Sequence, residues 1–197
     1  MELKEIVKKE FVENDKTLCF QSTPISKIIV LSILSDGIYD IILAYGWWKS
    51  LKQNFGYKIS PFWRGLFGMF TNFKLFPIFE KYTKVFITQE KNLKGIKTAV
   101  LYFLMLYMSN KLSITDLRLE LKNKLDPSTA TIIELIILLF TIASALILAS
   151  VQKKINKINE QYFPNAPQNP WKKSNIIWTV ILVILTILGF LSNFIPS

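Results

Sequence analysis

The sequence contains no histidine and only one cysteine, Cys19. Histidine is the commonest general base and metal ligand in proteins, so HExxH metal sites and histidine-based catalytic triads are excluded. A single cysteine excludes an intrachain disulfide and a cysteine-rich metal site. The P-loop, GxGxxG and GxSxG patterns are also missing. We therefore expect a protein that is not an enzyme and that has no cofactor and no metal centre.

Acidic residues are scarce as well: 14 Asp and Glu stand against 24 Lys and Arg, which gives a net charge of +10. Such an excess of positive charge can indicate nucleic-acid binding. Here the basic residues cluster at the flanks of apolar runs, where they fix the orientation of membrane segments and contact anionic headgroups. We therefore expect membrane lipids as partners and no nucleic acid.

Long apolar runs are what the chain has in abundance. Hydrophobic residues make up 51% of the sequence. Residues 174–197 carry no charge, and residues 127–152 carry only Glu134. A helix needs roughly 20 residues to cross a hydrocarbon core about 30 Å thick, and both runs reach that length. The sequence predicts an all-α fold, an integral membrane helical bundle with four or five inserted segments and additional interfacial amphipathic helices.

The chain divides into a polar start and a long apolar remainder. We expect residues 1–25 to be a cytosolic N-terminal lead-in, with a short helix over 3–12, and residues 26–197 to be a membrane domain. The predicted inserted segments are about 26–45, 59–79, 95–114, 128–151 and 174–195. Segment 59–79 contains Arg64, Lys74 and two prolines, so we expect it to be interfacial or re-entrant. Amphipathic helices are predicted over 112–125 and 151–162.

The lysines also predict an orientation. Five lysines lie in residues 153–173 and none follows Ser174. Because cytoplasmic loops carry the excess of Lys and Arg, the last helix is predicted to run from the cytoplasm outward, with the N-terminus cytoplasmic and the C-terminus outside. The side on which residues 48–60 lie depends on whether the earlier segments span fully or form a hairpin.

Segment 26–45 carries two aspartates, Asp36 and Asp40, in an otherwise apolar run. On the insertion scale, two aspartates at mid-membrane cost about as much as the ten Ile, Leu and Val residues gain. The Ser35–Gly37 tripeptide breaks helices readily. We expect a spanning or deeply inserted helix with a local break there, with its aspartates facing protein. The alternative is a re-entrant hairpin whose backbone is covered by protein or water.

Several side chains are candidates for function. If the helix continues, Asp36 and Asp40 share one face and could relay protons, bind a cation or form salt bridges, and we expect Asp40 to pair with Arg64. The predicted intramembrane polar cluster is Asp36, Asp40, Arg64, Lys74 and Glu134. Tryptophan is enriched at membrane–water interfaces. The tryptophans expected to be interfacial or lipid-facing are Trp47, Trp48, Trp63 and Trp171. Lysines expected to contact anionic lipid are Lys153, Lys154 and Lys157.

Two stretches, KIIVLSILSDGIYDIILAYGWWKSLK and GYKISPFWRGLF, carry a resemblance to known proteins. They resemble a family of uncharacterised bacterial multi-pass inner-membrane proteins with a domain of unknown function, and residues 151–171 are similar to the tail of longer members. Asp36 and Leu43 depart from the family pattern, whereas Asp40 matches it. The resemblance implies a location in the bacterial inner (cytoplasmic) membrane and implies no reaction.

Together these observations predict a small, non-enzymatic inner-membrane protein that acts through helix or lipid contacts. Such a protein could be a subunit of a membrane complex or a homo-oligomer. The alternative is a proton- or cation-coupled carrier or channel that uses the intramembrane carboxylates.

Overall fold

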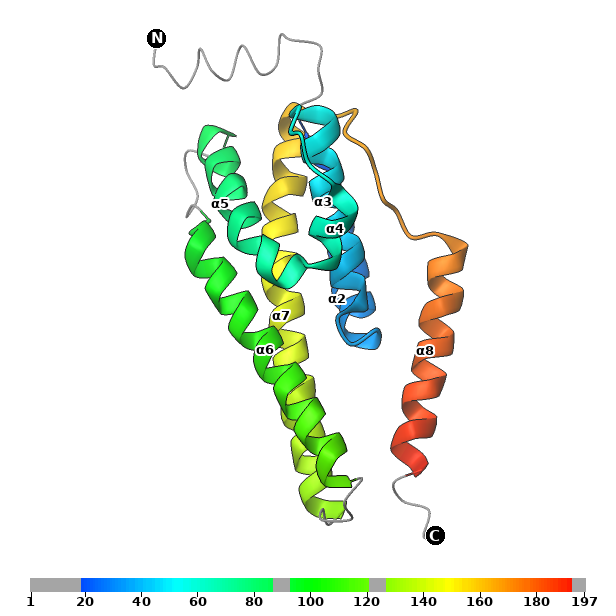
Figure 1. The fold of residues 1–197 in the computed structure, drawn as a ribbon. Coiled ribbons are helices and arrows are strands. Elements are labelled where there is room, and N and C mark those ends of the chain that lie inside the picture. The colour runs from blue at the N-terminus through cyan, green and yellow to red at the C-terminus, as the bar shows by residue number, and fades with distance from the viewer. Residues whose placement is uncertain (1–18, 87–92, 121–126, 193–197) are drawn as a thin grey trace, which may run out of the picture.

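The computed structural model describes residues 19–86, 93–120 and 127–192. Seven α-helices and no strands occur in these residues, so the predicted all-α fold is confirmed for them. The predicted helix over residues 3–12 lies outside the described part of the chain. Figure 1 shows that the helices run side by side along one direction, with the longest pair extending beyond the others.

The longest pair is α6 (Gly95–Glu120) and α7 (Pro127–Tyr162). The two helices run in opposite directions and pack along their length, with the hydroxyls of Ser109 and Thr141 3.0 Å apart. No proline or glycine occurs between Pro127 and Pro164, so nothing interrupts α7. The separate helices predicted over 128–151 and 151–162 are therefore one helix of 36 residues. Similarly, segment 95–114 and the described part of the amphipathic helix predicted over 112–125 form one helix, α6, while residues 121–125 lie outside the described residues.

The first apolar segment forms a helical hairpin made of α2 (Ile25–Leu34) and α3 (Ile38–Asn54). The break expected at Ser35–Gly37 is present, with left-handed backbone at Asp36 (φ 46°) and Gly37 (φ 82°). The chain reverses direction there, so the end of α3 lies beside the start of α2. This is seen at Asn54, whose side chain donates a 2.6 Å hydrogen bond to the carbonyl of Cys19, just before α2. The local break of the favoured interpretation is therefore present, and the reversal has the hairpin geometry of the alternative, while entry into a membrane stays a prediction.

A second reversal follows within the segment predicted as 59–79. Here α4 (Pro61–Leu66) and α5 (Gly68–Phe86) meet at Phe67. Gly65 of α4 lies directly against Tyr45 of α3, where an added Cβ would be 2.8 Å from the Tyr45 Cβ. The far end of α5 returns to the start of the first hairpin, where the rings of Tyr82 and Phe20 are 5.1 Å apart. Two half-length helical hairpins therefore pack against α6 and α7 (Figure 1).

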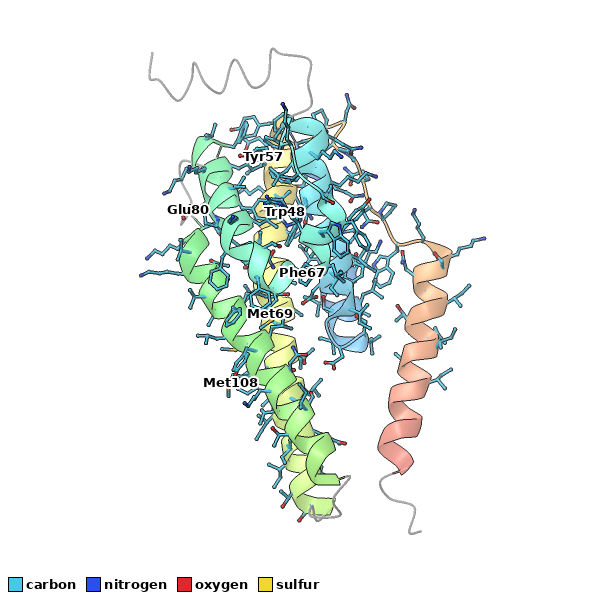
Figure 2. All side chains as sticks on the ribbon, in the orientation of Figure 1. Trp48, Tyr57, Phe67, Met69, Glu80 and Met108 are labelled. Carbon is cyan, nitrogen blue, oxygen red and sulfur yellow. The ribbon has the colours of Figure 1, made fainter. Side chains whose placement is uncertain are left out.

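The hydrophobic core lies where these hairpins meet α7. Trp47 and Trp48 are 1% and 0% exposed, and Figure 2 places Trp48 among the packed side chains between the hairpins and the long helices. The indole of Trp47 donates a 2.8 Å hydrogen bond to the Gln152 amide oxygen on α7. The expectation that these two tryptophans are lipid-facing is therefore wrong, because Trp47 packs against Phe76 and Phe79 of α5 and Trp48 lies under Arg64 of α4.

The last helix, α8 (Lys173–Ser192), is held by the segment that precedes it. Lys27 of α2 is buried, and its ammonium donates to the Asn169 Oδ1 at 2.8 Å and to the Pro170 carbonyl at 3.0 Å. The Trp171 indole donates to the Ser26 hydroxyl at 3.4 Å. These bonds fix the start of α8 beside the first turn of α2, and Figure 1 shows α8 alongside the bundle.

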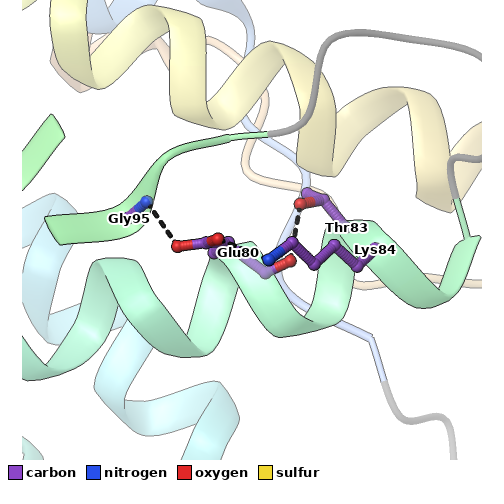
Figure 3. Close-up of polar contacts among 4 residues, drawn as sticks. All are labelled: Glu80, Thr83, Lys84 and Gly95. Carbon is purple, nitrogen blue, oxygen red and sulfur yellow. Dashed lines mark hydrogen bonds and ion pairs between the residues drawn. The ribbon is translucent and has the colours of Figure 1, made fainter. Parts of the chain in front are cut away.

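A polar contact joins α5 to the start of α6 (Figure 3). The Glu80 carboxylate accepts a 2.6 Å hydrogen bond from the Lys84 ammonium and a 2.8 Å bond from the backbone N–H of Gly95. The pKa of Glu80 is lowered, first by the Lys84 hydrogen bond and then by the Gly95 N–H. Gly95 also lies close to the α5 backbone, where an added Cβ would be 2.6 Å from the Phe76 oxygen.

Candidate functional site

The ends of the two hairpins meet halfway along α6 and enclose a cavity of about 190 Å³. We call it the tip cavity. Its wall combines the turn between α2 and α3, the turn between α4 and α5, and one face of α6. The lining residues are Asp36, Gly37, Ile38, Asp40, Ile41, Leu66, Gly68, Met69, Tyr102, Leu106 and Asn110. Figure 2 shows Phe67 and Met69 at this end of the hairpins, well away from Tyr57 at the opposite end.

Asp40 is the deepest polar group of the tip cavity. It lies in the first turn of α3 and is 6% exposed. Its Oδ2 accepts a 3.1 Å hydrogen bond from the Tyr102 hydroxyl on α6. Its Oδ1 is buried and has no hydrogen-bond partner among the described residues. The hydroxyl of Ser32 on α2 faces Asp40 as a weak donor; it is buried and makes no hydrogen bond of ordinary geometry in that part of the chain.

Asp36 lies at the rim of the same cavity and is exposed. Because it sits in the left-handed turn between α2 and α3, it does not share a helical face with Asp40, as a continuous helix would require. The Thr141 hydroxyl on α7 lies 3.5 Å from the Asp36 Oδ1, at the long limit of a hydrogen bond. Fold-back of the chain, and not helical spacing, brings the two aspartates to one cavity.

The other members of the predicted polar cluster lie elsewhere. Arg64 places its guanidinium over the ring of Trp48, 4.5 Å from the ring centre. Trp48 is eight residues from Asp40, about 12 Å of helical rise. Among the described residues Asp40 and Arg64 make no ion pair, so the predicted pairing is wrong. Lys74 is exposed on α5 and Glu134 is half-buried on α7, and neither lines the tip cavity.

Sequence reasoning missed the polar partners that other elements supply. Tyr102 and Asn110 both lie within the run predicted as the third apolar segment, eight residues apart. Thr141 lies in the fourth. Each is a polar side chain in an apolar helix, which is the signal that could have drawn attention to them. Their convergence on the aspartates depends on how the helices pack, which no local pattern contains.

The predicted lipid-contact lysines gather on α7. Lys153 and Lys157 are exposed and Lys154 is half-buried, and all three line an open groove of about 620 Å³. The groove also contains Ile25 of α2. Its remaining lining residues are Ser150, Asn156 and the acid Glu160, so the three lysines give it a net positive charge of the kind that attracts anionic headgroups.

The two remaining tryptophans lie near the surface. Trp63 is 58% exposed on α4. Trp171 is half-buried beside the first turn of α2. The expectation of interfacial positions is compatible with these exposures.

Comparison of the chain with protein-family models, with curated proteins and with solved structures yields no match.

Proposed function

We propose that the chain is a non-enzymatic integral membrane protein of the bacterial inner membrane that acts through its helix and lipid contacts. In this proposal α6, α7 and α8 cross the bilayer. The two hairpins enter only the leaflet on the cytoplasmic side, and the tip cavity lies near the middle of the membrane.

The observation that carries the proposal is the apolar surface that α6, α7 and α8 expose. Monomeric soluble proteins rarely expose contiguous apolar patches larger than a few hundred Å². The exposed residues are Ile96, Val100, Leu101, Leu104, Tyr107, Met108, Ile132, Leu135, Ile136, Leu138, Leu139, Leu146, Ile176, Ile177, Val180, Ile181, Val183 and Ile184. Lipid would cover this surface, whereas water would leave it unpartnered.

The length of α7 agrees with this arrangement. Among the described residues it is the one helix long and apolar enough to cross a membrane. Residues 135–152 of α7 carry no charge and extend about 27 Å at the helical rise. That length approaches the thickness of a hydrocarbon core, about 30 Å. Only 28% of its most apolar stretch is buried within the protein, which leaves most of it for lipid.

The charges are consistent with one orientation. Exposed lysines lie in the last turn of α3, between the two hairpins, on the C-terminal part of α7 and just before α8. They include Lys52, Lys58, Lys153, Lys157 and Lys172. The excess of lysine on cytoplasmic loops predicts that these parts of the chain face the cytoplasm.

The hairpin lengths support entry into one leaflet. The 10 residues of α2 extend about 15 Å, half of a hydrocarbon core. Non-helical backbone at membrane depth is tolerated only where protein or water covers it. The turn at Asp36 and Gly37 meets that condition, because it lies against α6 and the tip cavity.

One substitution tests lipid contact directly. Leu139 is 64% exposed on α7. In water, Leu139→Lys would change stability by about 0.5 kcal/mol or less, as exposed substitutions usually do. In hydrocarbon, a lysine near the middle of a helix costs about 2.5–3.5 kcal/mol of insertion free energy. We expect Leu139→Lys to lower the amount of protein recovered in bacterial membranes after alkaline carbonate washing.

The matched control is Gln161→Lys, which adds the same charge to an exposed position at the lysine-rich end of the same helix. We expect it to be recovered like the original protein. Release of the original protein by carbonate without detergent, or equal recovery of both variants, would overturn the proposal.

A further inference from the structure

We propose that the tip cavity binds a small hard cation, with Asp40 and Asp36 as its charged ligands. From the sequence we expected no metal centre, although cation binding by the two aspartates was one of the alternatives left open. The proposal therefore rests on what the folded chain places around Asp40, and it goes beyond the proposed lipid and helix contacts.

The first argument is the unmatched charge of Asp40. Asp40 is only 6% exposed. One carboxylate oxygen has a single donor, the Tyr102 hydroxyl, and the other has no partner among the described residues. A buried carboxylate without a counter-charge is costly, and a bound cation removes that cost. Arg64, the counter-charge that the sequence predicted for Asp40, lies instead over the ring of Trp48.

The second argument is the chemistry of the wall. No lysine or arginine lines the cavity among the described residues, whereas two carboxylates do. The remaining polar side chains in the wall, Tyr102 and Asn110, each offer an oxygen. Oxygen ligands of this kind suit Na⁺, Mg²⁺ and Ca²⁺, and disfavour soft metals that prefer sulfur or imidazole.

The third argument concerns the hydroxyl of Ser32. It faces Asp40 as a weak donor, and no hydrogen bond of ordinary geometry reaches either Ser32 Oγ or Asp40 Oδ1, both buried, in the described residues. Buried polar atoms are nearly always satisfied by protein, water or an ion. An ion held by Asp40, alone or with its water, would supply a partner for the buried Asp40 oxygen, whereas Ser32 does not line the cavity.

The cavity also has the size and the entrance that an ion requires. Its volume of about 190 Å³ leaves room for water around an ion, since one water occupies about 30 Å³ in the liquid. Asp36 and Asn110 are exposed at the rim, and Asp40 is buried. The ion therefore meets the rim carboxylate first and is held at the inner one.

The experiment measures the midpoint of thermal unfolding of the purified full chain in detergent at increasing concentrations of salt. The probes are NaCl, MgCl₂ and CaCl₂, with choline chloride at equal ionic strength as the reference. A ligand that binds the folded state raises the midpoint in a concentration-dependent way. We expect a saturable rise with at least one of the three cations above the choline reference, and its identity distinguishes a monovalent from a divalent site.

The variants test where the ion binds. Asp40→Asn should abolish the rise, and Asp36→Asn should shift the midpoint of the titration to at least severalfold higher cation concentration. Glu134→Gln, which removes an acid of α7 outside the cavity, should keep it. The proposal would be overturned if none of the three cations raised the unfolding midpoint of the original protein above the choline reference. It would also be overturned if the midpoint of Asp40→Asn rose as much as that of the original protein.

A second measurement covers the case in which Asp40→Asn does not fold. Equilibrium dialysis with the cation that gives the rise compares the original protein with Tyr102→Phe, which removes only the hydroxyl bonded to Asp40. A severalfold change in affinity in this variant supports the site, and identical affinity overturns it. Since both measurements are made in detergent, their failure leaves the proposed membrane location standing, and failure of that location leaves the cation site testable.

Discussion

The joint between α5 and α6 allows a sharp prediction about packing, because Gly95 has no room for a side chain. An added Cβ would lie 2.6 Å from the carbonyl oxygen of Phe76 and 2.6 Å from the nitrogen of Pro77. These are backbone atoms, so no side-chain rotation relieves the contact. We predict that Gly95→Ala destabilises the folded chain.

The magnitude follows from the distance. Ordinary contact begins near 3.4 Å, so α6 would have to move by roughly 0.8 Å, and overpacking of this kind costs about 1–3 kcal/mol in free energy of unfolding. The movement would also lengthen the hydrogen bond from the Gly95 N–H to Glu80, which is 2.8 Å long (Figure 3). For a chain of this size each kcal/mol lowers the unfolding temperature by about 2–4 °C.

The assay is thermal unfolding in detergent, followed by circular dichroism. The matched control is Gly46→Ala, which lies inside α3 and whose added Cβ would be 3.2 Å from the flexible Gln21 side chain. Alanine gains up to about 1 kcal/mol over glycine inside a helix, so we expect this variant to be neutral or more stable. Equal midpoints for Gly95→Ala and the original protein would refute the packing argument.

Two further predictions concern polar contacts. Folding lowers the pKa of Glu80, chiefly through Lys84, so the stabilisation it provides is present above the ordinary value of 4.5 and disappears as the pH falls through the lower folded value. The unfolding temperature of the original protein should therefore fall between neutral pH and a pH below the ordinary glutamate pKa, and it should fall less in Glu80→Gln. The same fall in both proteins would contradict this. Gln152→Leu leaves the buried Trp47 N–H unpaired and also removes the bonds from the Gln152 amide to the Gln21 carbonyl and Asn156, so it should cost at least about 1–3 kcal/mol, measured by thermal unfolding. The cost should shrink in a Trp47→Phe background, and the same cost in both backgrounds would exclude the bond.

Local signals in the sequence predicted the helices and the position of the first break. They did not predict that the chain reverses direction after this break. Ser35–Gly37 is a helix-breaking tripeptide, and the backbone there is left-handed. Whether the chain then continues or reverses depends on distant contacts, such as the bond from Asn54 to the Cys19 carbonyl. Those contacts pair residues 35 positions apart, which periodicity within one segment cannot encode.

The same limit explains the errors at the tryptophans and at Arg64. Trp47 and Trp48 precede Lys49, a composition typical of an interface, yet both rings are buried, Trp47 against α5 and Gln152 of α7 and Trp48 under Arg64 of α4. Arg64 and Asp40 are opposite charges near in sequence, which predicted a pair. In the folded chain the second hairpin places Arg64 over Trp48, a contact that cation–π attraction favours.

The candidate site was predicted in part. The two aspartates do line one cavity, although a fold-back and not a shared helical face brings them there. Tyr102 and Asn110 come from α6, and each lies more than 60 residues after Asp40 in the sequence. A single sequence contains no signal that pairs those positions, so the inner partner of Asp40 emerges only from the three-dimensional arrangement.

The most direct test of the account is the side of the membrane on which Lys58 lies, between the two hairpins. Lys58 and Lys157 are exposed at the lysine-rich end, and Thr115 is exposed toward the opposite end of α6. Each is changed to cysteine in turn, and intact cells are labelled with a membrane-impermeant maleimide. The original protein, whose Cys19 is buried, serves as the unlabelled control. Two one-leaflet hairpins predict that Lys58→Cys is protected like Lys157→Cys, while Thr115→Cys is labelled from outside. Labelling of Lys58→Cys from outside would mean that the early segments cross the bilayer, and it would contradict the account.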